Sequence, residues 1–226
     1  PASMNKSHLW DAYVPNAVGD DELAFYEKAG FGERLPWGDS PAVLVVDMTK
    51  QFTRSEFDLG REDAATSAVE ATARLLAAAR DADHPVVYTR GPSETDGAVL
   101  DAYRGIMDQK RVHRSYDPGE GNEIDPRLDP DSDDLVIEKA KPSAFFDTHL
   151  AGALLHLGVY TVLVAGMTTS GCVRATSIDA YSHNLRPVVP QQAVADRSPT
   201  AHEAALFDID MKYGNVTPLE AVLEQL

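Results

Sequence analysis

Three residues with reactive side chains follow predicted strands. Asp47 comes directly after the apolar run 42–46, Lys139 comes directly after 134–138, and Cys172 lies beyond the strand-like segment 160–165 and a turn at 166–171. The carboxyl ends of parallel strands meet at one edge of an open α/β sheet, where ligands bind, so we expect these side chains to lie close together. A helix N-terminus and a neighbouring ammonium lower a thiol pKa, and a carboxylate can shuttle its proton. The three residues therefore predict nucleophilic catalysis by Cys172.

Each of these residues also has a purely structural interpretation. Asp47 could be a turn residue at a strand end, Lys139 a solvated lysine, and Cys172 a small buried hydrophobe. Their coincidence at one sheet edge favours the catalytic interpretation. Lys141 would share a strand face with Lys139, so side-chain parity alone leaves both lysines open. Because Cys172 is the only cysteine, no intramolecular disulfide can form, which fits a reducing compartment.

The elements that must position these residues alternate between strand and helix. Strands are predicted at 42–46, 85–89, 134–138, 160–165 and 187–189, and helices at 62–82, 147–157, 172–183, 200–213 and 218–225. This order predicts an α/β fold of three layers (α/β/α) with a mostly parallel, doubly wound sheet. Residues 91–134 form a long excursion with a short helix near 98–108.

Two regions are predicted from the pattern: an arm at 1–40 with a short helix at 20–28, and a domain at 41–226. Residues 1–3 precede Met4 and are expected to be a cloning remnant.

Composition narrows the function classes. The 226 residues carry a formal net charge of −16, which argues against nucleic acid as a partner because phosphate binding needs clustered Lys and Arg. No apolar run has the length of a membrane span and no signal-peptide pattern opens the chain, so we expect no membrane partner and a cytoplasmic protein. The acidic surface fits either a salt-rich host or plain solubility.

Three motifs carry a resemblance to a known family. Val45-Val-Asp-Met-Thr49 with Phe52, Val136-Ile-Glu-Lys-Ala-Lys-Pro-Ser-Ala-Phe145 with Thr148, and Gly166-Met-Thr-Thr-Ser-Gly-Cys-Val-Arg-Ala-Thr176 resemble, in order, the isochorismatase-like cysteine hydrolases. Within the family, the segments 168–176, 195–198 and 206–213 are most similar to the branch that hydrolyses N-carbamoylsarcosine, which the arm segment 21–32 also resembles. Maleamate amidohydrolases are similar almost as far.

The resemblance implies an Asp–Lys–Cys triad. Cys172 would attack the carbonyl, Asp47 would move the proton, and the spacing to Ser143 selects Lys139 over Lys141. The oxyanion hole would consist of the backbone N–H groups of Thr168 and Cys172, with a cis peptide bond between Met167 and Thr168.

The same resemblance implies the ligands. Arg197 would hold a substrate carboxylate and Thr169 would also bind substrate, although Arg197 could instead be a solvated residue or a partner of Asp196. The expected substrate is a small anionic amide, with an N-carbamoyl amino acid first and maleamate second. An isochorismatase-type vinyl ether hydrolase, which needs no cysteine, and a catalytically idle scaffold are the alternatives. The resemblance also implies a homo-oligomer, either a dimer or a tetramer.

No metal or other cofactor is expected. Residues 88–94 lack the histidines that the metal-dependent branch carries after its second strand. His113 is interpreted as a solvated residue of the excursion. Four other histidines fall on predicted helices and are interpreted as surface residues: His149, His156, His183 and His202.

Overall fold

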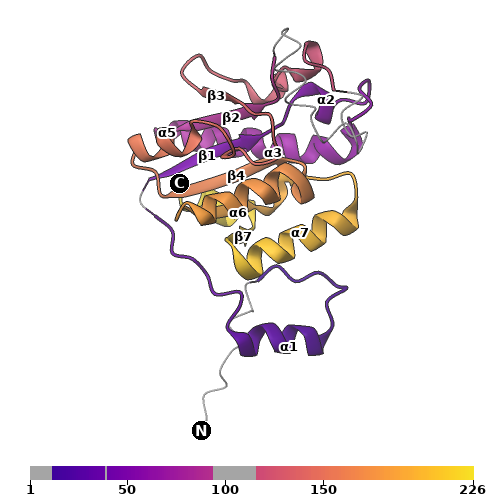
Figure 1. Ribbon diagram of the computed structural model, residues 1–226, viewed down its shortest axis with the longest axis vertical. Coiled ribbons are helices and arrows are strands. Elements are labelled where there is room, and N and C mark those ends of the chain that lie inside the picture. Colours follow the sequence, from indigo (N-terminus) through magenta and orange to yellow (C-terminus); the bar gives the residue numbers. More distant parts are fainter. Residues whose placement is uncertain (1–11, 39, 94–115) are drawn as a thin grey trace.

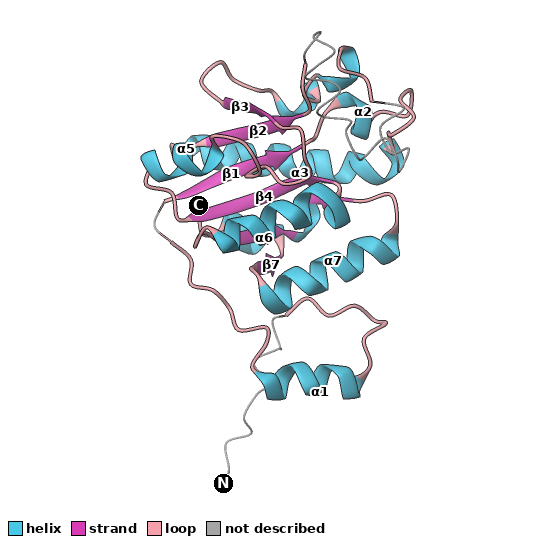
Figure 2. Ribbon diagram, viewed as in Figure 1, coloured by secondary structure: helices cyan, strands magenta, loops and turns pink. Residues whose placement is uncertain are grey.

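A seven-stranded parallel sheet forms the centre of the protein (Figures 1 and 2). The computed structural model describes residues 12–38, 40–93 and 116–226. Along the sheet the strands follow the order β3-β2-β1-β4-β5-β7, and β6 pairs with the end of β4. The strands are β1 (Pro41–Val46), β2 (Val86–Arg90), β3 (Leu135–Glu138), β4 (Thr161–Met167), β5 (Arg186–Pro190), β6 (Val194–Ala195) and β7 (Asn215–Thr217). All strand pairs are parallel, which confirms the predicted fold class.

Helices cover both faces of this sheet. The described helices are α1 (Asp20–Ala29), α2 (Lys50–Thr53), α3 (Glu62–Asp81), α5 (Leu150–His156), α6 (Arg174–Ser182), α7 (Pro199–Lys212) and α8 (Leu219–Leu223). Of these, α1 belongs to the N-terminal arm and does not cover the sheet. Successive side chains of a strand point to opposite faces. Val43 and Val45 accordingly pack with α3 and α8, whereas Leu44 and Val46 pack with α5, α6 and α7. Figure 1 shows α3 behind the sheet and the second group in front.

Short elements join these layers. They are the 3-10 turns η3 (Glu120–Asn122), η4 (Pro126–Leu128) and η6 (Gln191–Ala193) and the π-helical turn η5 (Thr169–Val173).

Several predicted elements differ from the observed ones. The strand predicted at 134–138 is β3. Its apolar residues favoured a buried strand, and this part of the prediction is wrong: β3 is the edge strand, with Val136 38% exposed, because only β2 pairs with it. The helix predicted at 147–157 is α5 and begins later, after the positive φ of Asp147. The helix predicted from residue 172 is preceded by η5, in which Cys172 itself lies. The short β6, β7 and α2 were not predicted, and the helix predicted near 98–108 lies outside the described residues.

The N-terminal arm lies against α7 (Figure 1). Helix α1 has no buried residue, so it depends on contacts to the domain rather than on a core of its own. The ring of Tyr26 packs edge-on against Phe207 at a centroid distance of 5.2 Å. The arm's Arg34 donates from Nη1 to Oδ1 of the buried Asp210 over 2.7 Å, and Tyr13 donates its backbone N–H to Oδ2 over 2.7 Å. A single α7 carboxylate therefore holds both ends of the described part of the arm.

Candidate active site

Asp47, Lys139 and Cys172 meet at the carboxyl edge of the sheet. Nζ of Lys139 lies 2.6 Å from Oδ2 of Asp47, and these two side chains are only 5% and 6% exposed. The thiol of Cys172 lies within hydrogen-bonding reach of both the carboxylate and the ammonium. Cys172 is half-buried as a whole residue, whereas Asp47 and Lys139 are buried. The structure therefore brings together the three residues that the sequence singled out.

Strand β2 fixes the orientation of Asp47. The backbone of Asp47 has a φ of 50°, a left-handed conformation that Asp tolerates better than most residues. Thr89, which pairs with Val46 in the sheet, donates from Oγ1 to Oδ1 of Asp47 over 2.8 Å. One carboxylate oxygen thus binds Thr89 and the other binds Lys139. Sequence reasoning missed Thr89, although its place near the end of the adjacent strand is the signal that could have found it.

The geometry decides between the two lysines. The backbone N–H of Lys139 donates to the carbonyl of Arg90 over 3.0 Å, which continues the β2–β3 pairing by one residue. Its Nζ also donates to the backbone carbonyl of Lys141 over 3.1 Å. Lys141 thus contributes a carbonyl oxygen that fixes the Lys139 ammonium, while the ammonium of Lys139 is the one that contacts Asp47.

The segment from Thr168 to Cys172, called here the nucleophile loop, joins β4 to α6. The peptide bond between Met167 and Thr168 is cis, as the resemblance implied. The carbonyl of Thr168 accepts hydrogen bonds from the N–H groups of Gly171 and Val173, over 3.0 and 3.2 Å. These bonds close the loop into the π turn that carries Cys172. The oxyanion hole predicted from the Thr168 and Cys172 amides stays a prediction.

The charges of the triad depend on its burial. Burial by itself would lower the pKa of Lys139, but attraction to Asp47 and Cys172 outweighs it, and the pKa is raised. Burial raises the pKa of Cys172 to about 12, with a further rise from the Asp47 carboxylate and an opposing effect of Lys139. This direction is opposite to the lowering predicted from the helix N-terminus and the ammonium, because removing the thiolate from water costs more than Lys139 returns. The resting thiol is therefore protonated beside the carboxylate of Asp47.

Arg197 lies beside the triad in an exposed position. Its Nε donates to the carbonyl of Leu59 over 3.0 Å, and its guanidinium carbon lies 5.5 Å from the centre of the Phe52 ring. Its charge interacts with Cys172. Burial and the nearby Arg61 lower the pKa of Arg197, although a guanidinium stays protonated in proteins. Among the described residues its Nη1 and Nη2 have no hydrogen-bond acceptor, so the outer fork of the guanidinium is available to a ligand.

Thr169 is fully buried and binds a histidine. Its Oγ1 lies 2.8 Å from Nδ1 of His202 on α7. The next residue, Ser170, donates from both its N–H and its Oγ to Oδ2 of Asp196, each over 2.7 Å. His202 was interpreted from the sequence as a surface residue. Its contact with the nucleophile loop depends on the packing of α7, for which the sequence around residue 202 gives no signal.

Comparison with known proteins gives this arrangement a family. The family model described as the isochorismatase domain matches residues 41–221. The chain belongs to the isochorismatase family. A maleamate amidohydrolase of Pseudomonas putida is 37% identical over 203 residues, which cover 87% of this chain and 91% of that protein. An N-carbamoylsarcosine amidase of an Arthrobacter species is 31% identical over 209 residues, which cover 90% of this chain and 77% of that protein.

A solved structure shows the same isochorismatase fold. The isochorismatase family protein of Desulfovibrio vulgaris superposes with a TM-score of 0.73 at 25% identity, covering 83% of this chain and 98% of that one. Within the described residues of this isochorismatase-family chain, no group of three or more His, Cys, Asp or Glu side chains could hold a metal ion. His113 lies outside those residues, so metal independence stays a prediction. No helix in the described part of the chain has the length and apolar character of a membrane span.

Proposed function

We propose that this protein is an amidohydrolase that cleaves a small anionic amide through a covalent intermediate on Cys172. The observation that carries the proposal is the contact of the Cys172 thiol with the Asp47–Lys139 ion pair, whose N–O distance is 2.6 Å. A nucleophile beside its base, with the base oriented by a third group, is the arrangement that covalent catalysis requires. The amidohydrolase and amidase among the relatives support the same reaction class.

The proposed reaction begins from the protonated thiol. Asp47 accepts the thiol proton as the sulfur attacks the amide carbon, and Lys139 stabilises the carboxylate and the developing thiolate. The N–H groups of Thr168 and Cys172 would bind the oxyanion. Asp47 then returns the proton to the leaving nitrogen, which departs as ammonia and leaves a thioester-type acyl enzyme. Water, deprotonated by Asp47, hydrolyses this intermediate and restores the thiol.

The proposed substrate carries a carboxylate because of Arg197. The free outer fork of its guanidinium suits bidentate binding of a carboxylate. In a chain with a net charge of −16, such a local cation also offsets the repulsion of an anionic ligand. Maleamate and N-carbamoyl amino acids both combine a carboxylate with a terminal –C(O)NH₂ group. For an N-carbamoyl substrate the products would be ammonia, carbon dioxide and the amine. The higher identity to the maleamate amidohydrolase makes maleamate the first substrate to assay, which reverses the order that the motifs gave.

Ammonia release from a substrate panel tests the proposal. The panel contains maleamate, several N-carbamoyl amino acids and the neutral amide nicotinamide. We expect turnover of at least one anionic member by the wild type and none by Cys172→Ser, because a hydroxyl is far less acidic than a thiol. Circular dichroism and urea unfolding of the variant show whether it is folded. Substantial turnover by folded Cys172→Ser would exclude covalent catalysis by this residue, and an inactive wild type would favour the scaffold alternative.

A further inference from the structure

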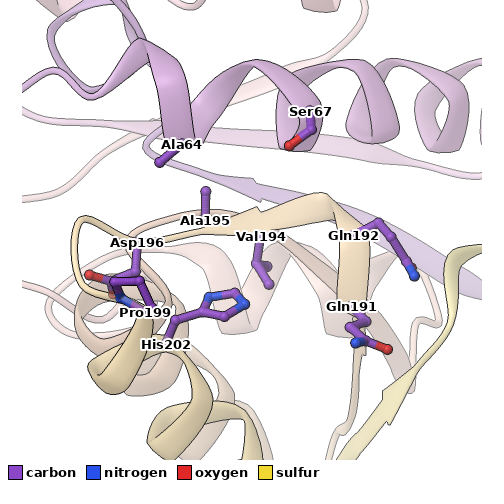
Figure 3. A pocket seen from close by; sticks show the side chains of 9 residues that line it. All are labelled: Ala64, Ser67, Gln191, Gln192, Val194, Ala195, Asp196, Pro199 and His202. Atoms are coloured by element: carbon purple, nitrogen blue, oxygen red, sulfur yellow. The ribbon is translucent and has the colours of Figure 1, made fainter.

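A cavity lies next to the nucleophile loop, and none of the three triad residues lines it. Its volume is about 350 Å³, and it lies between α3, the η6–β6 segment and the start of α7 (Figure 3). His202 and Asp196 line it together with Ala64 and Ser67 of α3. Figure 3 shows the imidazole of His202 pointing into this space. One side of the ring therefore faces the cavity, while Nδ1 faces Thr169.

His202 and Asp196 hold two consecutive residues of the nucleophile loop. His202 binds Oγ1 of Thr169 over 2.8 Å, and Asp196 binds both the N–H and the Oγ of Ser170 over 2.7 Å. Hydrogen bonds from Ser170, Ser198 and Arg197 overcome the effect of burial and lower the pKa of Asp196, so this residue is ionised. The part of the loop that precedes Cys172 is thus fixed from the α7 side by one carboxylate and one imidazole.

We propose that His202 is a positioning residue for the nucleophile loop, acting through Thr169. In its neutral form, with the proton on Nε2 toward the cavity, the imidazole accepts the hydroxyl proton of Thr169 at Nδ1. This hydrogen bond fixes the buried Thr169 side chain and leaves the oxygen lone pairs of Thr169 directed away from His202. Protonation of His202 turns Nδ1 into a donor and reverses the direction of the bond. The inference rests on the proposed function only in that the loop it positions carries the proposed nucleophile.

The surroundings of His202 favour the neutral form. Burial lowers the pKa of His202, against opposing effects of Asp196 and Glu203. The α3 residues that line the same cavity, Ala64 and Ser67, carry no charge. A group with a lowered pKa is neutral at pH 7 and becomes protonated only as the pH falls below the ordinary range of a histidine. We therefore expect the hydrogen bond that positions Thr169 to be lost when His202 becomes protonated at acidic pH.

Two substitutions of His202 separate the effect of its hydrogen bond to Thr169 from the effect of the space that its ring fills. His202→Phe keeps a ring but removes both nitrogens, and the adjoining cavity gives the ring room. His202→Asn keeps a hydrogen-bonding group near the place of Nδ1 and does not titrate. We expect His202→Phe to lower kcat about tenfold with a smaller change in KM, the size of one lost hydrogen bond, and His202→Asn to recover most of that loss. The acid-side fall in kcat that belongs to His202 should be absent in His202→Asn.

The controls make the outcome decisive. His156→Phe removes an exposed histidine at the end of α5 and should match the wild type. Thr169→Val combined with His202→Phe should lose no more than the larger single loss, because both changes break the same bond. Additive losses, or equal behaviour of His202→Phe and His156→Phe, would overturn the proposal.

The rate at which iodoacetamide alkylates Cys172 needs no substrate, so it reports a loop shift in His202→Phe even if no amide in the panel is cleaved. An unchanged alkylation rate would also overturn the proposal.

Discussion

At the scale of single residues, Cys172 is a protonated thiol at rest and not a preformed thiolate. The neighbouring ammonium of Lys139 favours the thiolate, but burial and the carboxylate of Asp47 outweigh it. In the proposed reaction the thiol would therefore lose its proton to Asp47 during attack rather than before it. This order gives Asp47 a chemical role that the ion pair alone would not require.

Thiol titration tests this balance. We expect slow alkylation of wild-type Cys172 at neutral pH and faster alkylation as the pH rises, because burial raises the pKa of the thiol. Asp47→Asn should lower the pKa of the thiol and Lys139→Ala should raise it, because their charges act on it in opposite directions. Iodoacetamide rates of the three proteins, compared at the same pH values, give the direction of each change, and Lys141→Ala is the matched control. A larger shift in the Lys141 variant, or fast alkylation of the wild type at pH 7, would contradict this account.

Arg197 gives a prediction about substrate charge. Arg197→Lys should raise KM for an anionic amide about tenfold, because a bidentate charged contact contributes roughly 1.5–3 kcal/mol and lysine offers only a point charge. The same change should affect a neutral amide such as nicotinamide little. Steady-state kinetics on both substrates provide the comparison, and Arg61→Lys, which changes the neighbouring cation, is the control. Equal losses on the two substrates would remove Arg197 from the carboxylate site.

Some of these site residues could be predicted from the sequence and others could not. Asp47, Lys139 and Cys172 could be found because each follows a strand, and strand ends can be read from apolar runs. The hydrogen bonds of Thr89 and His202 could not be predicted. The bond of Thr89 depends on the register between β1 and β2, and the bond of His202 depends on how α7 packs. The pKa of Cys172 was predicted in the wrong direction for a related reason: its main cause is burial, which only the folded chain determines.

At the scale of elements, a buried carboxylate supports the short helix that follows Asp47. Asp125 is fully buried and accepts hydrogen bonds from Thr53 Oγ1 at 2.6 Å and from Arg127 Nη2 at 2.6 Å. Its backbone N–H donates to the carbonyl of Met48 over 2.9 Å. Asp125 thus connects η4 to both ends of the segment 48–53, which leads away from the active-site aspartate. This helix of four residues was not predicted, because one turn carries no detectable periodicity.

Asp125 also gives the fold a pH dependence. Burial would raise its pKa, but the bonds from Arg127 and Thr53 lower it to about 2. A carboxyl whose pKa is lower in the folded state stabilises the protein above its unfolded pKa, and this contribution is lost as the pH falls toward 2. Asp125→Asn should therefore lower the free energy of unfolding by about 2 kcal/mol near neutral pH, and the difference from the wild type should shrink between pH 4 and pH 2.

Urea unfolding across that pH range measures the effect. Asp63 is the matched control, since Arg61 lowers its pKa to about 2 as well, but on the exposed surface. Asp63→Asn should change stability little, because exposed ion pairs contribute little. A pH-independent loss in Asp125→Asn would mean that packing, not charge, explains the role of Asp125.

At the scale of the whole molecule, the sequence predicted the parallel sheet and its two helical layers but not the order of the strands. Alternating strands and helices determine the class, whereas the edge position of β3 depends on which strands pair. The homo-oligomer stays a prediction, to be measured by sedimentation velocity.

Metal independence is the remaining prediction for the molecule as a whole. We expect ammonia release to survive exhaustive dialysis against a chelator within about twofold, because residues 88–94 include no histidine and the proposed chemistry needs only the triad. With a net charge of −16 the surface attracts cations unspecifically, so magnesium added back serves as the control for ionic effects. Activity lost on dialysis and restored by zinc or manganese, but not by magnesium, would show a metal requirement.

The pairing of β1 with β4 has a consequence for biosynthesis. Pro41 lies opposite Thr161 in the sheet, so β1 is synthesised 120 residues before the strand that covers one of its edges. At about 5–20 residues per second, a ribosome needs roughly 6–24 s for that stretch. During this interval β1 can pair only with β2, and an apolar strand with an open edge is a template for association with other chains. Truncated chains that end before β4 are therefore expected to aggregate. The proposed catalytic centre, which needs Cys172 from beyond β4, is completed only after this interval has passed.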